Sequence, residues 1–234
     1  MKRNGDVSDA HLQAVRRRIL DVTKDLFVKY GYKKTTIRMI VQHSGILIGS
    51  IYYIFRNKED ICRSLMATII SKAITKIDER CAGESAAFRY AAACYIELLE
   101  MEAAPIIRDL YKEGYDSGII FETMVNEHVK MCHHMFDGTP LAASEEEYYE
   151  RMLLLKGAVR GCIGELYFEK PHDHARSRHA LLLMALFLFK LSPEESRAIV
   201  ERIEARDDLW LEIANELAQQ PIDETDDTAK QCIL

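Results

Sequence analysis

Proline, glycine-rich linkers and long apolar runs are all scarce in this sequence. Proline occurs 5 times in 234 residues, and no Pro-rich or Gly/Ser-rich stretch interrupts the chain. The longest apolar run covers residues 180–189 and ends at Lys190, whereas a membrane-spanning helix needs about 20 residues. The first 15 residues are polar and lack the apolar core of a secretory signal. We therefore expect a soluble, cytoplasmic protein of one or two domains without a membrane segment.

Motifs of catalysis are also missing. None of the six cysteines forms a C-x-x-C pair, and most fall in apolar helical patterns, where a free cysteine behaves as a small hydrophobic residue. The chain has no G-x-S-x-G, no H-E-x-x-H, no phosphate-binding loop and no dinucleotide fingerprint. We predict a reduced protein that is not an enzyme and has no catalytic residues or cofactor. A catalytic site dispersed along the chain would escape such a motif search.

Histidine and cysteine come close together at two places. His128, Cys132 and His133 fall in one helical stretch, and His172 and His174 flank an aspartate. Neither stretch has the ligand spacing of a closed zinc site. We therefore predict no metal, and we expect these histidines to face solvent or to lie at the edge of the core.

Charge is distributed unevenly along the chain. Residues 1–60 contain 12 Lys/Arg and 6 Asp/Glu, whereas residues 61–234 contain 19 Lys/Arg and 31 Asp/Glu. A basic first quarter on a chain of net charge -6 indicates that only this quarter approaches a polyanion such as nucleic acid. A chance fluctuation in surface charge is the alternative interpretation.

The sequence predicts helices nearly throughout. Apolar residues recur three and four positions apart, as in Ile199 and Ile203, and no clear alternating strand pattern is present. Glycine and proline divide the chain into about ten helices. Start signals support several of them, with Asn57 and Ser192 as N-caps that are followed by acidic residues. The predicted fold class is therefore all-α.

Residues 15–61 have the spacing of a helix-turn-helix. A first helix of about residues 15–30 ends at Gly31, a second of about eight residues follows Thr35 and Thr36, and Ser44–Gly45 ends it. A short third helix of about residues 48–55 comes next. In a helix-turn-helix the later helix enters the major groove of DNA.

Several residues of this segment suit a DNA backbone. The second helix begins with hydroxyls and carries Arg38 in its first turn instead of an acid, so its N-terminus can accept a phosphate. The ammonium of Lys58 can hold a phosphate at the other edge of the groove. Tyr52 and Tyr53 are adjacent, so one can pack on the core while the other reaches the backbone.

The fixed spacing of more than a dozen positions resembles the signature of the TetR family. The matching residues are Ile19-Leu20, Leu26-Phe27, Gly31-Tyr32, Thr35-Thr36-Ile37, Ile40, Gly45, Gly49, Ile51-Tyr52, Phe55 and Lys58-Glu59. The resemblance implies a homodimer that places two recognition helices in successive major grooves of operator DNA, with half-sites about 34–36 Å apart. It also implies a small-molecule effector pocket in each C-terminal domain, with repression relieved when the effector binds.

The resemblance assigns roles to individual residues of the head. Thr36, Tyr52 and Lys58 are expected to contact phosphates, and Arg38, Gln42, Ser50 and Tyr53 are expected to contact the groove. We expect Ile51 and Phe55 to pack in the core. The complete set of predicted DNA-binding residues is Thr35, Thr36, Arg38, Gln42, Ser50, Tyr52, Tyr53 and Lys58.

The recognition helix departs from the family pattern at three positions. Leu47 stands where Ser or Thr usually caps the helix, Ile48 replaces a polar residue, and Ile54 stands where His is frequent. Aliphatic side chains can contact thymine methyl groups but cannot form bidentate hydrogen bonds with a base. The head could therefore read few bases, favour A/T-rich sites or bind weakly. The alternative function is a helical dimer of the same fold that has lost specific DNA binding and acts through protein partners.

The C-terminal part is predicted to dimerise and to bind the effector. Helices of about residues 145–168 and 175–191 are dimer candidates because of their apolar and glycine content. Residues 180–189 could instead form the core of one subunit. The effector pocket is expected among residues 85–136, lined by Tyr95, Met101, Arg108, Tyr111, Tyr115, Met131 and Met135. Such residues at helical spacing are also typical of an ordinary core.

The expected organisation has three parts. Residues 1–60 form a three-helix helix-turn-helix domain, and residues 61–220 form a helical ligand-binding and dimerisation domain. Residues 221–234 form an acidic tail with little apolar content, which we expect to be disordered.

Overall fold

The structure is a computed structural model that describes residues 3–103, 105–165, 169 and 173–219. The described residues form helices and no strands, which confirms the all-α prediction. The helices are α1 (Arg3–Lys34), α2 (Ile37–Ser44), α3 (Ile48–Ile54), α4 (Lys58–Arg80), α5 (Ala86–Ala103), α6 (Pro105–Asp116), α7 (Gly118–Phe136), α8 (Glu145–Glu165), α9 (His174–Leu188), α10 (Pro193–Glu204) and α11 (Asp207–Gln219).

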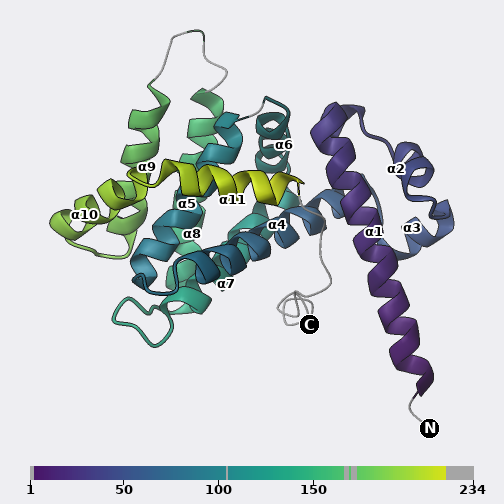
Figure 1. Ribbon diagram of the computed structural model, residues 1–234, viewed down its shortest axis with the longest axis horizontal. Helices are drawn as coiled ribbons and strands as arrows, with labels where there is room; N and C mark the ends of the chain where they lie inside the picture. The colour runs from purple at the N-terminus through teal and green to yellow at the C-terminus, as the bar shows by residue number, and fades with distance from the viewer. Residues whose placement is uncertain (1–2, 104, 166–168, 170–172, 220–234) are drawn as a thin grey trace.

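The molecule has a head and a body, joined by α4 (Figure 1). Helices α1, α2 and α3 form the head at one end, and α4 runs from the head into the body. Helix α5 lies at the centre of the body, where it packs against α4, α6, α7, α9, α10 and α11. Helix α6 packs against both α5 and α1, so it is a second contact between body and head.

Local capping explains where several helices begin. The Thr36 hydroxyl accepts a hydrogen bond from the Met39 N–H, and the Asn57 side chain accepts one from the Asp60 N–H. Ser192 and Glu195 form a complete capping box at the start of α10. These residues occupy N–H groups that a helix start leaves without intrahelical partners, and the predicted caps at Asn57 and Ser192 are confirmed.

The first helix is longer than the sequence pattern predicts. It begins at Arg3, whereas the apolar periodicity indicates a start near Val15. The helical conformation is interrupted at Gly31, where a φ of 78° lies in the region that favours glycine. The predicted end at Gly31 is therefore correct, and the extra turns at the N-terminus are an extension that the periodicity of the core does not mark.

The predicted boundary at residue 60 falls inside α4, which belongs to both parts of the molecule. The last helix, α11, ends at Gln219, and the predicted tail of residues 221–234 lies outside the described residues. No helix in the part of the chain that the structure describes is both long and apolar enough to cross a membrane.

Candidate nucleic-acid interface and effector domain

The head contains a helix-turn-helix built on a small apolar core. Helix α2 ends at Gly45, whose φ of 72° lets its N–H donate to the Val41 carbonyl at 3.0 Å. Three residues later α3 begins, and it turns Ile51 inward. The core beneath the motif is formed by buried apolar residues of α1, α2 and α3 and the residue after α3, namely Ile19, Leu20, Phe27, Ile40, Ile51 and Phe55.

The outer side of the motif carries most of the predicted DNA-binding residues. Thr36, Arg38, Gln42 and Ser50 are exposed, as are two aromatic residues of the third helix. Tyr53 is 80% exposed and Tyr52 is 51% exposed. Both tyrosines therefore face solvent, whereas the sequence analysis expected one of them to pack on the core.

Thr35 is a correction to the predicted contacts. Its side chain is fully buried, and its hydroxyl donates to the carbonyls of Gly31 at 2.9 Å and Leu26 at 3.2 Å. The hydroxyl thus satisfies carbonyls at the end of α1, where helical partners run out. Thr35 fixes the connection between α1 and α2, and we remove it from the candidate DNA contacts.

Lys58 also has a structural partner that the sequence did not reveal. Its ammonium donates to the carbonyls of Tyr32 at 2.7 Å and Thr35 at 3.0 Å, and it lies 4.1 Å from the centre of the Tyr32 ring. Partial burial lowers its pKa from the ordinary value, although Cys62 and Glu113 oppose this effect. Lys58 therefore joins α4 to the end of α1, and its role at a phosphate stays a prediction.

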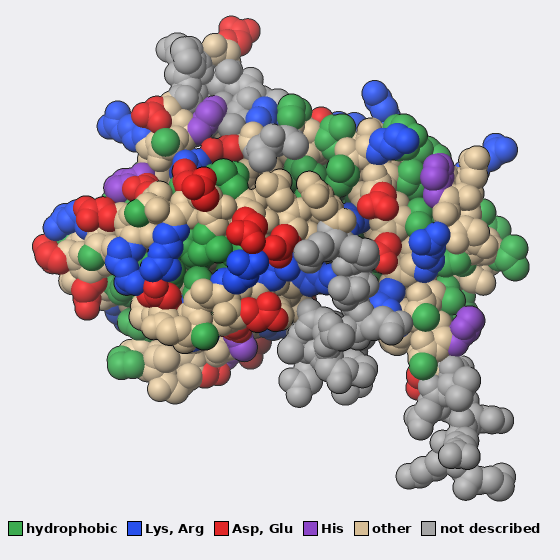
Figure 2. Space-filling model, viewed as in Figure 1, with side chains coloured by type: hydrophobic (Ala, Val, Ile, Leu, Met, Phe, Trp, Pro, Cys, Tyr) green, Lys and Arg blue, Asp and Glu red, His purple; other side chains and the backbone are tan. Residues whose placement is uncertain are grey.

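The exposed surface of α3 is largely apolar. Leu47 is 77% exposed and Ile48 is 53% exposed, and Leu47 gives the helix no side-chain cap. A groove of about 440 Å³ separates this helix from the extension of α1, and it is lined by His11, Leu12, Val15, Ile46, Leu47, Gly49, Ser50, Tyr53 and Ile54. Figure 2 shows hydrophobic side chains reaching the surface at the right-hand end, where Figure 1 places α3.

A charged network is buried in the body, among α5, α6, α7 and α8. Lys156 is fully buried and forms an ion pair with Glu97, which is itself 7% exposed. The other oxygen of Glu97 accepts a hydrogen bond from the Tyr115 hydroxyl at 2.9 Å, and Nε2 of His128 lies 3.6 Å from the oxygen that pairs with Lys156. Burial by itself raises the pKa of Glu97, but Lys156 and then His128 bring that pKa below its ordinary value. Glu97 is therefore a carboxylate with partners from three other helices.

A second carboxyl group lies one helical turn further along α5. Glu100 is half-buried and accepts a hydrogen bond from the Tyr111 hydroxyl. Burial, with a smaller contribution from the charge of Glu97, raises the pKa of Glu100 to about 7 against the lowering effect of the Tyr111 hydrogen bond. Glu100 thus titrates near neutral pH, while Glu97 stays ionised.

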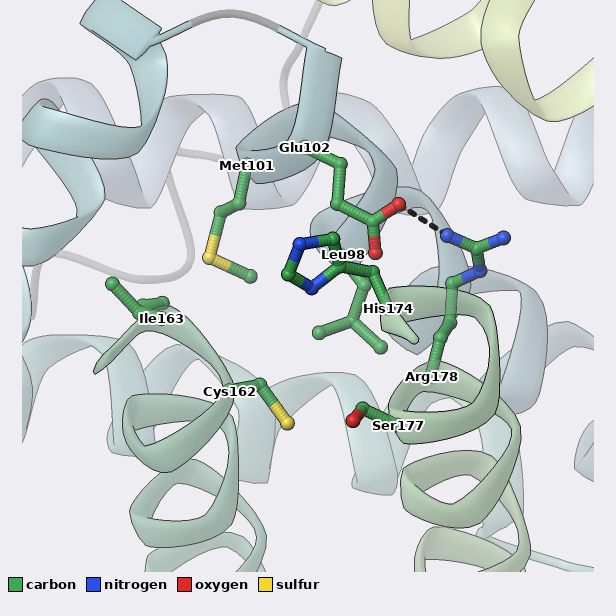
Figure 3. A pocket seen from close by; sticks show the side chains of 8 residues that line it. All are labelled: Leu98, Met101, Glu102, Cys162, Ile163, His174, Ser177 and Arg178. Atoms are coloured by element: carbon green, nitrogen blue, oxygen red, sulfur yellow. Dashed lines mark hydrogen bonds and ion pairs between the residues drawn. The ribbon is translucent and has the colours of Figure 1, made fainter. Parts of the chain in front are cut away.

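The predicted effector residues do not line one common cavity. Tyr95 donates to Asp207, Arg108 donates to the Met101 carbonyl at 3.3 Å, and Tyr111 and Tyr115 bind the two glutamates. The side chains of Met131 and Met135 are buried in the core. Only Met101 borders the cavity in Figure 3, which lies among α5, α8 and α9 and is also lined by Leu98, Glu102, Cys162, Ile163, His174, Ser177 and Arg178. Its volume of about 20 Å³ is close to that of one water, far below the roughly 300 Å³ of a small-molecule site.

Sequence analysis missed the charged network itself. Glu97 and Glu100 are the signals that could have revealed it, because they interrupt an apolar helical pattern. Lys156 follows three leucines and is a third signal of the same kind. His128, which was expected to face solvent or to lie at the edge of the core, is instead buried, and its Nδ1 donates to the Met124 carbonyl at 2.7 Å. No group of three or more candidate metal ligands occurs among residues 3–103, 105–165, 169 and 173–219.

Helix α6 links this network to the head. Its inner side carries Tyr111 and Tyr115, and its outer side carries Glu113, which pairs with Lys33 of α1 at 2.7 Å. The residue after α6, Ser117, donates to Glu59 of α4. Helix α6 therefore contacts the buried glutamates and α1, and the residue that follows it contacts α4.

Helices α8 and α9 each carry apolar side chains that this subunit leaves exposed. Leu154 is 63% exposed and Phe187 is 72% exposed, and Tyr149 and Leu153 are also exposed. Gly157 and Gly161 lie on α8 with open space beside them. Leu181, Leu182, Ala185, Leu186 and Phe189 are buried within the subunit, so much of residues 180–189 belongs to the core of one subunit, and dimerisation through this segment stays a prediction. Leu166 and Phe168 lie outside the described residues.

Comparison with known proteins places the head in a known family. Residues 19–65 match the family model for bacterial regulatory proteins of the tetR family. An HTH-type transcriptional repressor of Mycobacterium tuberculosis, Rv1474c, is 45% identical over 53 residues, which are 23% of this chain and 28% of the repressor. The fatty acid metabolism regulator protein of Bacillus subtilis is 31% identical over 61 residues, covering 26% of this chain and 31% of the regulator. The chain thus aligns with about a third or less of the length of these curated relatives.

The overall fold also has a known counterpart. SmeT, the repressor of the multidrug efflux pump SmeDEF of Stenotrophomonas maltophilia, superposes with a TM-score of 0.50 and 17% identity. The superposition covers 75% of this chain and 90% of SmeT, so the likeness in fold extends through the body as well as the head. The helix-turn-helix of this chain is therefore similar in sequence to that of bacterial regulatory proteins of the tetR family, and its all-helical fold is similar to that of SmeT.

Proposed function

We propose that this protein is a homodimeric, DNA-binding transcriptional regulator that is released from its operator by a small-molecule effector. The observation that carries the proposal is the exposed outer side of the helix-turn-helix, with Arg38, Gln42 and Ser50 accessible on a rigid core. Residues 29–58 contain six Lys/Arg and no Asp/Glu, so this side attracts phosphates. We propose no catalytic role, and we propose repression as the mode because Rv1474c and SmeT are repressors.

The dimer is proposed to form through α8 and α9. Two copies of the exposed apolar surface around Leu154 and Phe187 would pair about a two-fold axis, as most soluble homodimers do. The glycines Gly157 and Gly161 leave open space for close approach. A dimer is also what the DNA-binding mode requires, because a single short helix reads only one half-site.

The effector is proposed to act at the buried network of Glu97, Glu100, Tyr111 and Tyr115. These side chains satisfy each other in the closed cluster, and the neighbouring cavity is too small for an effector. A ligand must therefore replace contacts that now hold α6 in place. Because α6 packs against α1, and Ser117 directly after α6 donates to Glu59 of α4, displacement of α6 would move the head.

The test is a salt titration of DNA binding by the full-length protein. Fluorescence anisotropy with duplexes from the region upstream of its own gene should show specific binding. The logarithm of the binding constant should fall linearly with the logarithm of the salt concentration. Arg38→Ala should weaken binding and reduce the salt slope by about 1 if Arg38 meets a phosphate. Arg197→Ala is the matched control, since Arg197 is an exposed arginine of α10 in the body. No specific binding even at low salt would overturn the proposal.

A protein-binding role is the second candidate, and the exposed Leu47 and Ile48 favour it. Apolar side chains on a recognition helix suit a protein surface as well as a base edge. The same titration separates the two functions, because a protein-binding head would give no sequence-specific duplex binding at any salt concentration.

A further inference from the structure

The recognition helix has almost no means of reading bases by hydrogen bonds. Residues 47–54 contain no Arg, Lys, Asn, Gln, Asp or Glu, which are the side chains that form bidentate or charged contacts with base edges. The hydrogen-bonding side chains of this stretch are Ser50, Tyr52 and Tyr53, each with one hydroxyl. Direct readout by this helix must therefore depend on apolar contact.

The exposed apolar side chains are placed at the start of the helix. Leu47 and Ile48 are 77% and 53% exposed, at the end of the turn that follows α2. In a helix-turn-helix the N-terminal residues of the second helix contact the base edges. The thymine C5-methyl is the apolar group that base pairs present in the major groove.

The charges around α3 fit DNA as the occupant better than an apolar protein surface. The motif and its flanks, residues 29–58, hold six cationic residues and no anionic one. Arg38 is exposed at the start of α2, close in sequence to the apolar tip, and Arg56 is exposed directly after α3. A cationic rim around an uncharged tip matches two rows of phosphates on either side of a groove floor.

We propose that Leu47 and Ile48 read thymine methyl groups in the major groove, so that the operator half-site has thymines at the positions they contact. This inference rests on the proposed function and names the chemistry of its recognition. Burying one methyl group adds roughly fourfold in affinity, and a dimer contacts each half-site once. Two thymines lost in a symmetric operator should therefore weaken binding about 15-fold.

The experiment compares thymine with deoxyuridine. Deoxyuridine lacks the C5-methyl but keeps the same hydrogen-bonding groups, so it removes apolar contact alone. A bound sequence is first selected from random duplexes with the full-length protein, and each thymine is then replaced by deoxyuridine in turn. Affinity should fall about fourfold at the contacted positions and stay unchanged at thymines outside the site.

A variant separates methyl contact from effects of deoxyuridine on DNA shape. Leu47→Ser removes an exposed side chain, so it leaves the core intact and adds an N-cap hydroxyl to α3. The variant should bind thymine and deoxyuridine duplexes equally at the position that Leu47 contacts. Ile119→Ser is the matched control, because Ile119 is an exposed isoleucine of α7, and it should keep the full preference for thymine.

The outcomes are distinct. Loss of the thymine preference in Leu47→Ser alone supports methyl reading. A specific operator that binds thymine and deoxyuridine duplexes equally overturns methyl reading and leaves the proposed function standing. An equal loss in wild type and Leu47→Ser also overturns it, because it assigns the effect to DNA shape. Failure to select any sequence overturns the proposed function itself, and this inference with it.

Discussion

Removing one partner of the buried Glu97–Lys156 ion pair should lower the free energy of unfolding by a measurable amount. Lys156 is fully buried, and the side chain of Glu97 is 9% exposed. Lys156→Met keeps an unbranched side chain of similar length, so it removes the charge without opening a large cavity. The Glu97 carboxylate then stays buried without its cationic partner, and breaking a buried pair in this way costs about 3–5 kcal/mol. We expect a loss at the lower end, because Tyr115 still donates to Glu97.

The double variant tests whether the loss comes from the orphaned charge. Glu97→Gln alone leaves Lys156 buried and unpaired, and it should also destabilise by several kcal/mol. Glu97→Gln combined with Lys156→Met removes both charges, and we expect it within about 1 kcal/mol of the wild type. The free energy of unfolding is measured with urea at one fixed protein concentration, because the stability of a dimer depends on concentration. The double-mutant cycle then gives the coupling energy.

The pH dependence of Lys156→Met supplies an independent check. Without Lys156, burial raises the pKa of Glu97 above its value in the unfolded chain. The destabilisation of Lys156→Met is then present above about pH 4.3, which is the pKa of Glu97 in the unfolded chain. It disappears as the pH falls toward that value. The reasoning would be refuted if Lys156→Met and Glu97→Gln each lowered the free energy of unfolding by less than about 1 kcal/mol and if their effects were additive. Such a result would mean that water screens the ion pair.

Two other perturbations test the body and its interface. Because burial raises the pKa of Glu100 to about 7, the unfolded chain loses this proton first, so the group lowers the free energy of unfolding as pH rises from about 4.5 to 7. Glu100→Gln should remove this decline and so stabilise the protein by roughly 1–3 kcal/mol at pH 8, given that Glu100 is half-buried. Urea midpoints measured across this pH range would show the change, and an unchanged pH profile would contradict the prediction. Leu154→Glu should convert the dimer to monomer in sedimentation velocity, while Leu211→Glu, on an exposed position of α11, should not; a dimer that survives Leu154→Glu would place the interface elsewhere.

The helix-turn-helix could be predicted because its signals are local. Asn57 caps a helix through an N–H three residues away, and Gly45 ends one through a carbonyl four residues back. Such contacts depend on residue type and spacing, which a sequence displays directly. The bounds of α2 and α3 accordingly match the predicted lengths.

Other features of the head depend on contacts that the sequence does not display. Thr35 and Thr36 are adjacent and chemically identical, yet one caps α2 at the surface and the other is buried against carbonyls of α1. Lys58 is likewise held by carbonyls 23 and 26 residues away. Which hydroxyl or ammonium faces DNA is decided by tertiary packing, so the family pattern alone assigned these side chains incorrectly or incompletely.

The effector domain was harder to predict because its polar groups meet across long separations. Glu97 and Lys156 are 59 residues apart, and Tyr115 comes from a third helix. Met and aromatic residues at helical spacing were predicted to line an effector pocket, with an ordinary core as the alternative, and they could not show that charged groups lie at its centre. Single charges within apolar helical faces would have been the better guide, since a buried charge requires a partner.

The energies of these contacts explain how a weak ligand could control the head. Helix α6 is held to the body by the Tyr111 and Tyr115 hydrogen bonds, and a bond to a charged group contributes about 1.5–3 kcal/mol. The exposed ion pair between Glu113 of α6 and Lys33 of the head contributes at most about 1 kcal/mol. The packing of α6 against α1 makes these two helices move together. Allosteric coupling typically amounts to about 1–3 kcal/mol. If the effector acts at this network as proposed, a ligand that replaces one tyrosine hydroxyl at Glu97 or Glu100 would change enough free energy to shift α6, and with it the angle of the recognition helix.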